Sequence, residues 1–171
     1  LAKTGTGVAH CPISNMKLSS GIARIPEMLK LGVPVGLAVD GSASNDGSSL
    51  MEELRVAFLL HRRNSSREAP TGYDILKMAT RGSARLLGRD DIGQIAVGKC
   101  ADLFMIDSRR LELVGSCYDP KSVLGTVGVR GPVDYTVVNG KVTVEHGRLA
   151  TIDEEKVALQ ANQKCDAYLS I

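Results

Sequence analysis

The sequence has few aromatic residues and no strong excess of either charge. Its 171 residues include no Trp, two Phe and four Tyr, and 21 basic and 19 acidic residues leave a formal net charge of +2. Aromatic platforms on which single-stranded nucleic acids stack are therefore not expected. A charge balance this close also argues against a basic nucleic-acid-binding surface. Nucleic acid is thus not predicted as a partner.

The sequence also lacks the patterns of membrane proteins and of disulfide-rich proteins. No apolar run approaches the roughly 18–20 residues that a membrane helix needs, and no secretory signal peptide is recognisable, so no membrane association is predicted. The four cysteines contain no C-x-x-C pair; they are Cys11, Cys100, Cys117 and Cys165. We interpret them as reduced thiols, which predicts a cytoplasmic location.

What the sequence does contain is an ordinary globular composition, with 43% hydrophobic and 23% charged residues. In the first half, the apolar run 33–39 is typical of a strand buried on both faces of a parallel sheet, and residues 8–10 indicate the end of another strand. Apolar spacing predicts amphipathic helices between and after these strands, over residues 22–31, 50–61 and 73–87, the last broken near Gly82. This alternation predicts parallel strands with helical crossovers.

The second half changes period and becomes rich in Val and Gly. Residues 101–107 are predicted to form a strand, and residues 133–138 and 141–145 a hairpin. Asn139-Gly140 between the two hairpin strands favours a type I′ turn, because both central residues of that turn need positive φ. A terminal amphipathic helix is predicted over residues 153–169, with acidic residues at its start.

Asp40 is the first candidate for chemistry. It ends the apolar run 33–39 and is followed by the polar stretch 41–49. In open α/β sheets and α/β barrels, the carboxyl ends of the strands form the active-site face. A carboxylate in that position can ligate a metal or accept a proton, and it can equally cap its own turn, as Asp often does. The local sequence leaves both interpretations open.

His10 is the second candidate, because it also ends an apolar strand and is followed directly by Cys11 and Pro12. A histidine there can bind a metal, a substrate or a backbone carbonyl, or it can be a structural residue of the loop. In the loop predicted over residues 11–21, Ser14 and Asn15 can orient a polar substrate or brace the loop through local turns.

The other polar residues of this half do not complete a catalytic site. Glu53 and Arg55 are expected on the solvated face of the helix 50–61, and His61 at its end, where the helix dipole favours a cation. A catalytic zinc usually takes three protein ligands and a water, whereas the chain has three His in all. The P-loop, the G-x-S-x-G elbow and the compact nucleobase-deaminase signature are missing from the sequence.

Two motifs together resemble the metal-dependent amidohydrolase superfamily. One is Val8-Ala9-His10-Cys11-Pro12-Ile13-Ser14-Asn15-Met16-Lys17-Leu18, followed by Ser20-Gly21-Ile22, and the other is Val39-Asp40-Gly41-Ser42-Ala43-Ser44-Asn45. The resemblance is to the aminohydrolase and chlorohydrolase branch, which includes 8-oxoguanine deaminase, hydroxyatrazine ethylaminohydrolase and S-adenosylhomocysteine deaminase. Later segments agree with this resemblance, namely Gly93-Gln94-Ile95, Gly98, Ala101-Asp102-Leu103 and Val138-Asn139-Gly140-Lys141.

The resemblance implies an α/β fold: the C-terminal part of a TIM-type (β/α)8 barrel, with its last two strands and helices, plus part of a small β-sandwich. Residues 1–88 would be the barrel portion, 89–149 the sandwich portion and 150–171 a C-terminal helix. A barrel alone usually takes about 250 residues. The chain is therefore expected to be the C-terminal portion of a larger enzyme, which pairs with a missing N-terminal half or forms a homo-oligomer.

The resemblance also implies roles for three residues. Asp40 resembles the family's metal ligand and general base on barrel strand eight, which would hold zinc or, alternatively, iron. The metal lowers the pKa of a bound water toward about 7, and the carboxylate takes the proton. His10 would act at the pocket mouth as a catalytic and substrate-binding residue, and Asn15 would bind substrate on the same rim.

The implied reaction is the hydrolytic deamination of an amino-substituted purine, pterin or triazine-like ring, with release of ammonia. One alternative is a relative that releases chloride or an alkylamine by the same attack of water. Another is a catalytically inactive fragment that serves only as a structural or assembly module. The isolated chain, whose metal site is incomplete, is expected to be inactive.

Overall fold

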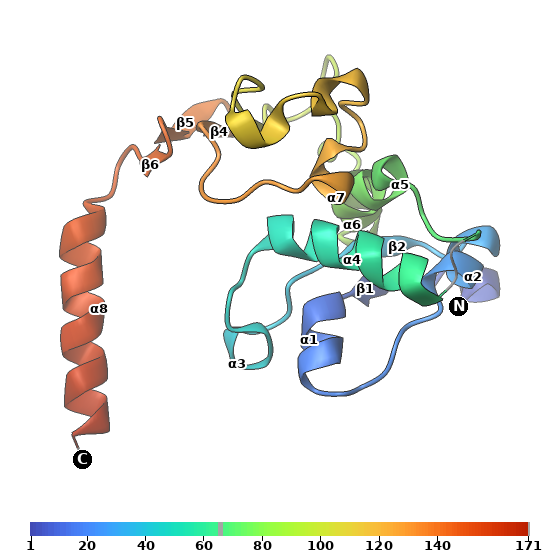
Figure 1. Cartoon of the computed structure of the whole chain (residues 1–171), viewed down its shortest axis with the longest axis horizontal. Coiled ribbons are helices and arrows are strands. Elements are labelled where there is room, and N and C mark those ends of the chain that lie inside the picture. The colour runs from blue at the N-terminus through green and yellow to red at the C-terminus, as the bar shows by residue number, and fades with distance from the viewer. Residues whose placement is uncertain (65–66, 171) are drawn as a thin grey trace. The chain divides into compact units, whose positions relative to one another are not determined.

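The structure consists of two parts, each with its own β-sheet. The computed structural model describes residues 1–64 and 67–170. The chain divides into two compact units: residues 1–99 with 108–130, and residues 100–107 with the chain from residue 131 onward. The fold is mixed α/β, with a two-stranded parallel sheet in the first unit and a four-stranded antiparallel sheet in the second (Figure 1).

The parallel sheet pairs β1 (Val8–His10) with β2 (Val35–Leu37), so that His10 lies opposite Leu37. Both predicted strands are confirmed, although β2 is shorter than the apolar run that indicated it. All residues of β2 are buried, as expected of a strand covered on both faces. The pairing continues briefly past the strand, because the Ala38 amide donates to the His10 carbonyl at 2.9 Å.

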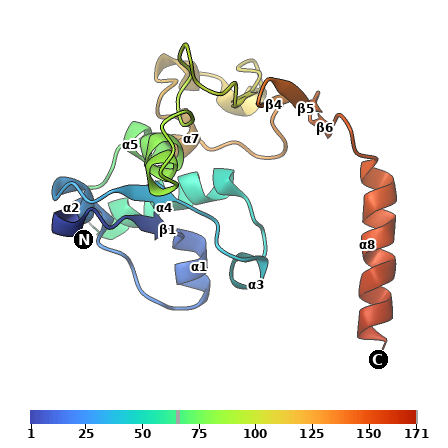
Figure 2. The ribbon, with the colours of Figure 1, turned by 180° about the vertical axis from the view of Figure 1, so that it is seen from behind.

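The segment after β1 is helical where a loop was predicted over residues 11–21. Helix α1 (Pro12–Lys17) begins with Pro12 at its first position and follows β1 directly (Figure 2). Proline suits this position because its missing N–H and fixed φ match the first helical turn. Helix α2 (Ile25–Lys30) likewise carries a proline in its first turn, and it starts later than the predicted helix 22–31.

A series of helices follows β2 in the first unit. They are α3 (Ser42–Asn45), α4 (Leu50–Asn64), α5 (Gly72–Lys77), the π-helical turn η2 (Met78–Gly82) and α6 (Ser83–Leu86). The break predicted near Gly82 is this π turn, which lies against β2. A Cβ atom built on Gly82 would stand 2.1 Å from the Val35 carbonyl oxygen. Glycine is therefore required where the backbone of η2 approaches that of β2.

Shorter elements complete the first unit. They are the 3-10 turns η1 (Ala2–Thr4), η3 (Leu111–Leu113) and η4 (Ser116–Tyr118), and helix α7 (Val123–Thr126), which packs against α4 and α5. The apolar residues buried between these elements include Ile25, Leu54, Ala57 and Ile75. Among the described residues, no helix is both long enough and apolar enough to cross a membrane.

The second unit contains an antiparallel sheet in the order β3-β4-β5-β6. Its strands are β3 (Leu103–Met105), β4 (Tyr135–Val138), β5 (Lys141–Glu145) and β6 (Arg148–Leu149). The predicted hairpin is confirmed, since β4 and β5 pair around Asn139 and Gly140 with φ values of 48° and 77°. A register shift between Thr136 and Val137, which the residue pattern does not indicate, interrupts this pairing.

The chain continues into helix α8 (Glu154–Leu169), where a helix was predicted. Asp153 caps it, because its carboxylate accepts a hydrogen bond from the Lys156 amide at 3.0 Å. Every residue of α8 is exposed, including the apolar side chains of Val157, Leu159 and Tyr168.

The four cysteines are not joined in disulfides within the described parts of the chain.

The contact between η2 and β2 generates a stability prediction. Gly82→Ala should lower the free energy of unfolding by about 2–3 kcal/mol, because the added methyl group would meet the Val35 backbone and force a shift. Urea unfolding at equilibrium measures this change. Gly41→Ala is the matched control, since Gly41 has φ −74° and its Cβ would meet only the Ser44 hydroxyl at 3.9 Å. An equal effect of the two substitutions would contradict the prediction.

Candidate functional site

Asp40 lies on the surface where the chain leaves β2. It has a positive φ of 66°, a conformation that Asp adopts more readily than most residues and that is often found at functional turns. Its Oδ1 accepts a hydrogen bond from the Gly41 amide at 2.7 Å, and its Oδ2 accepts one from the Ser14 hydroxyl at 2.6 Å. The carboxylate thus caps its own turn and also binds the segment that follows β1.

These hydrogen bonds stabilise the charged form of the carboxyl group. The Ser14 hydroxyl, followed by the Gly41 amide, holds the pKa of Asp40 below its usual value. Asp40 is therefore ionised at neutral pH and remains exposed to solvent. An ionised, accessible carboxylate can bind a cation or accept a proton.

Ser14 connects the two strand ends. It lies on α1, is 1% exposed, and reaches Asp40 across the carboxyl ends of β1 and β2. Asn15 is the next residue on the same helix and is half-buried. The carbonyl of Asn15 accepts a hydrogen bond from the Ser20 amide at 2.9 Å, so its backbone holds the turn after α1.

His10 is buried at the end of β1, with 2% of its surface exposed. Its Nε2 lies 3.0 Å from the Nε2 of His61 on α4. Burial, and secondly the charge of His61, lower the pKa of His10 to about 4; burial also lowers the pKa of His61. Both rings are thus neutral at pH 7, one donating and the other accepting the shared hydrogen.

The contacts of His10 differ from those of Asp40. His10 Nδ1 is buried and has no hydrogen-bond partner among the described residues. His61 was predicted at a helix end, where the dipole favours a cation. That prediction of a favoured positive charge is wrong, because His61 is 1% exposed and faces another histidine. The structure therefore brings together Asp40 with Ser14, and His10 with His61.

Glu53 was expected on the solvated face of α4, and this prediction is wrong. Its side chain is fully buried. Oε2 accepts a hydrogen bond from the Ile13 amide at 3.1 Å, and Oε1 accepts one from Asn45 Nδ2 at 2.5 Å. Burial raises the pKa of Glu53, whereas these two hydrogen bonds oppose that shift. The missed signal was the i, i+4, i+8 spacing of Glu53, Ala57 and His61, which puts all three on one buried stripe.

Arg55 was also expected on the solvated face, and it is half-buried. Its guanidinium donates to the carbonyl oxygens of Gly125, at 3.2 Å, and of Thr126. Both acceptors lie in the last turn of α7, where carbonyl groups lack partners within the helix. Arg55 therefore ties α4 to α7 and has a structural role.

The described residues fit a metal ion only in part. Asp40 offers ionised oxygen atoms, which suit zinc or iron as one ligand. Within residues 1–64 and 67–170, however, no group of three or more His, Cys, Asp or Glu side chains could together hold a metal ion. A catalytic zinc usually takes three protein ligands. The described part of this chain thus provides one candidate ligand and not a complete site.

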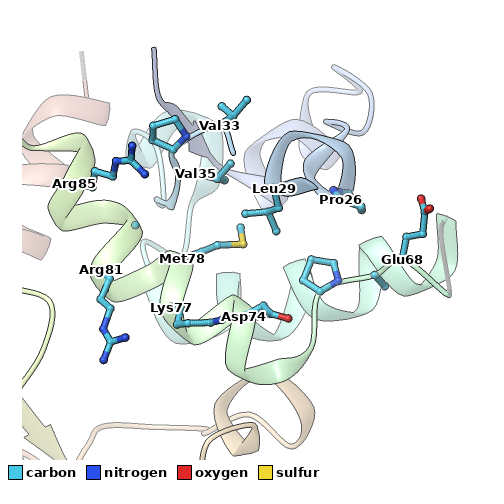
Figure 3. A pocket seen from close by; sticks show the side chains of 14 residues that line it. Pro26, Leu29, Val33, Val35, Glu68, Asp74, Lys77, Met78, Arg81 and Arg85 are labelled. Atoms are coloured by element: carbon cyan, nitrogen blue, oxygen red, sulfur yellow. Dashed lines mark ion pairs between the residues drawn. The ribbon is translucent and has the colours of Figure 1, made fainter. Parts of the chain in front are cut away.

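A cavity of about 530 Å³ lies elsewhere in the first unit, between α2, β2, α5 and η2. Figure 3 shows Leu29, Val35 and Met78 gathered in its middle, with Lys77 and Arg81 on the same helical segment as Met78. Asp40 and His10 do not belong to its lining. The cavity is therefore separate from the candidate site at the strand ends.

Comparison with known proteins identifies what the chain is similar to. Residues 1–143 match the amidohydrolase family. The chain is 46% identical over 165 residues to a hydroxydechloroatrazine ethylaminohydrolase of Pseudomonas sp. (strain ADP), covering 95% of this chain and 34% of that protein. It is 45% identical over 153 residues to an 8-oxoguanine deaminase of Pseudomonas aeruginosa, covering 90% of this chain and 34% of the relative.

Solved structures give the same result. An adenosine deaminase from Xanthomonas campestris with bound zinc matches with a TM-score of 0.93 and 32% identity, over 99% of this chain and 39% of that one. An atrazine chlorohydrolase from Arthrobacter aurescens complexed with zinc matches with a TM-score of 0.89 and 34% identity, over 95% of this chain and 36% of the other.

The chain thus spans between a third and two fifths of the length of these relatives. The resemblance seen in the motifs around His10 and Asp40 is confirmed, since the family match includes both. With most of its residues matched, the chain belongs to the amidohydrolase family.

Proposed function

We propose that this chain contributes the Asp40 region to a metal-dependent hydrolase that deaminates an amino-substituted nitrogen heterocycle. The observation that carries the proposal is the ionised, accessible carboxylate at the carboxyl end of a buried strand, in a member of the amidohydrolase family. Relatives named as deaminases of 8-oxoguanine and of adenosine, the latter with bound zinc, support it. The proposed substrate is a purine, pterin or triazine-like ring.

The proposed architecture places β1 and β2 as strands seven and eight of a TIM-type barrel, and the antiparallel sheet as part of a β-sandwich. Support comes from the parallel pairing of the two strands and from the similarity to larger amidohydrolase structures. Residues 1–88, 89–149 and 150–171 remain the proposed barrel, sandwich and helix portions. Further barrel strands would come from outside this chain, and we propose a homo-oligomer in the cytoplasm as the working form.

In this proposal Asp40 has two linked tasks at the strand ends. A zinc ion, or alternatively iron, would bind to its carboxylate and would supply Lewis-acid activation of water. Asp40 itself takes up a proton, which its low pKa allows it to release again readily. Ser14 and Gly41 hold the carboxylate at a fixed orientation throughout, because each occupies one of its oxygen atoms.

His10 and Asn15 are proposed to serve the substrate side of the same site. His10 ends β1, and its buried Nδ1 is a polar atom not used by the described residues. This nitrogen could bind a polar group of the substrate or of a segment supplied from outside the chain. We propose the same role for Asn15, which is half-buried and lies next to Ser14 on α1.

A second candidate function is displacement of a different leaving group. Two relatives favour it, the one named hydroxydechloroatrazine ethylaminohydrolase and the one named atrazine chlorohydrolase. The same attack by water would then release an alkylamine or chloride. Assays of ammonia, ethylamine and chloride release, run in parallel on the assembled enzyme with amino-, ethylamino- and chloro-substituted rings, would distinguish these reactions. Release of none of them would favour a purely structural role.

Asp40→Asn should lower turnover of the assembled enzyme by at least about a hundredfold, because the amide cannot accept the proton. Ammonia release from aminopurine, aminopterin and aminotriazine substrates measures the effect. Asp46→Asn is the matched control, because Asp46 is an exposed carboxylate of the same loop that pairs with Lys17 at 2.7 Å. Unchanged turnover in Asp40→Asn would refute the assignment, whatever the control shows.

The chain by itself should bind zinc weakly, since its described residues offer one candidate ligand where a catalytic zinc needs about three. Metal analysis after dialysis against zinc-containing buffer should find far less than one zinc per chain. A tightly held stoichiometric metal that disappears in Asp40→Asn would show that the chain completes a site alone.

The buried histidine pair should make folding sensitive to mild acid. His10 has its pKa lowered from 6.5 to about 4, so its folded and unfolded forms are both neutral above pH 6.5. As the pH falls below 6.5, His10 becomes protonated in the unfolded chain but stays neutral in the folded chain. Stability should therefore decrease by about 3 kcal/mol in total, with the loss complete near the folded pKa.

Urea unfolding between pH 7 and pH 4 measures this loss. In His10→Gln the decrease should be smaller, because one of the two buried titrating rings is gone. The control His146→Gln removes an exposed histidine of the other unit and keeps the buried pair, so it should retain the wild-type dependence. Equal pH dependence in both variants would contradict this reasoning.

A further inference from the structure

The two residues that meet at the candidate site are carried by separate segments. Asp40 follows β2, and Ser14 lies on α1 after β1, yet their side chains approach to 2.6 Å. A hydrogen bond of this length forms only where the two segments bring the hydroxyl and the carboxylate together with good geometry. The parallel strands fix them up to His10 and Ala38, but both site residues lie beyond these positions. Something beyond the sheet must hold the two segments.

Glu53 makes that connection from a third element, α4. One of its carboxylate oxygens accepts from the Ile13 amide, the residue before Ser14. The other accepts from Asn45 Nδ2, and the same amide nitrogen donates at 2.6 Å to the carbonyl of Val39, the residue before Asp40. The residues that precede Ser14 and Asp40 in the chain are therefore both connected to Glu53. Ile13 is bound to it directly, and Val39 is connected to it through Asn45.

The chemistry of these groups specifies a carboxylate at position 53. The Ile13 amide and the Asn45 amide nitrogen are both donors, so both oxygens of Glu53 must be acceptors, as in the ionised form. In glutamine one of these oxygens becomes an NH2 group, which would face a donor in either orientation. The same reasoning assigns the amide of Asn45. Its NH2 group must face Val39 and Glu53, because in the flipped orientation the Asn45 oxygen would face their two acceptors.

We infer that Glu53 is a positioning residue that, through Ile13 and Asn45, holds Ser14 and Asp40 in the geometry of the candidate site. This inference rests on the proposed function for its effect on turnover. Its structural part stands independently, because Glu53 is fully buried and its bonds are specific. Removal of one partner of a buried charged hydrogen bond leaves the other unsatisfied, so the two segments would separate or rearrange.

The test compares Glu53→Gln with Glu52→Gln, the exposed neighbouring carboxylate of the same helix. In the assembled enzyme, Glu53→Gln should lower kcat by about tenfold to a hundredfold, as is usual when a group supporting a ligand is lost. KM should rise less than kcat falls, because both Ser14 and Asp40 are held through Glu53, whereas of the two proposed substrate-binding residues only Asn15 lies on a segment that Glu53 holds. Glu52→Gln should leave both constants unchanged. Rates are normalised to the folded fraction measured by circular dichroism.

Amide hydrogen exchange on the 171-residue chain gives a readout independent of activity. In Glu53→Gln, exchange should accelerate at Ile13 and in the turn from residues 41 to 46, while Val8 and Ala38, which hold the sheet, keep their protection. A merely structural role would accelerate exchange uniformly, following the global loss of stability. If Glu53→Gln does not fold, Asn45→Ala, which keeps the Ile13–Glu53 bond, tests the Asp40 side of the same connection.

The outcomes separate this inference from the proposed function. Loss of turnover in Asp40→Asn together with wild-type kcat and unchanged local exchange in Glu53→Gln would overturn the positioning role alone. Full turnover in Asp40→Asn would overturn the proposed function, while local exchange changes in Glu53→Gln would still support the connection. Uniform acceleration of exchange, with kcat proportional to folded protein, would also overturn the positioning role.

Discussion

The parallel pairing of β1 with β2 is the constraint on which the candidate site depends. Parallel strands present their carboxyl ends at the same edge, so the segments after His10 and after Leu37 begin side by side. The site then requires only short extensions, α1 on one side and the turn at Asp40 on the other. Since all residues of β2 are buried, a change of register would move apolar side chains as well as the site.

Polar groups inside the first unit convert this pairing into a defined geometry. Hydrophobic contacts are not directional and would allow the two segments to shift by small amounts. The bonds of Glu53 and the contact between His10 and His61 instead require particular atoms at particular distances. Both sets of bonds reach from α4 to the segments around the strand ends. Helix α4 thus carries the polar groups that we infer to orient the site, on the same helix as the buried apolar side chains of Leu54 and Ala57.

The sequence predicted the elements that depend on local patterns and failed where tertiary contacts decide. The β4–β5 hairpin followed from Asn139-Gly140, because the turn type itself requires positive φ. Helix α1 was missed because its Ser and Asn residues are typical of loops, and only the Pro12 position marks a helix start. Asp40 became a candidate site residue from its place after an apolar run, whereas its bond to Ser14 depends on two segments meeting in space.

Glu53 and Asp40 show why residue type alone does not assign a role. Both are carboxylates within one unit, yet hydrogen bonds lower the pKa of Asp40 and burial raises that of Glu53. Pairs of titratable groups whose surroundings shift their pKa values apart are suited to different tasks. Glu53 binds internal donors with both oxygens and is fully buried, so no ligand from solvent reaches it. Asp40 is also hydrogen-bonded, but it faces solvent and keeps lone pairs free, so it is the carboxylate able to bind a cation or a proton.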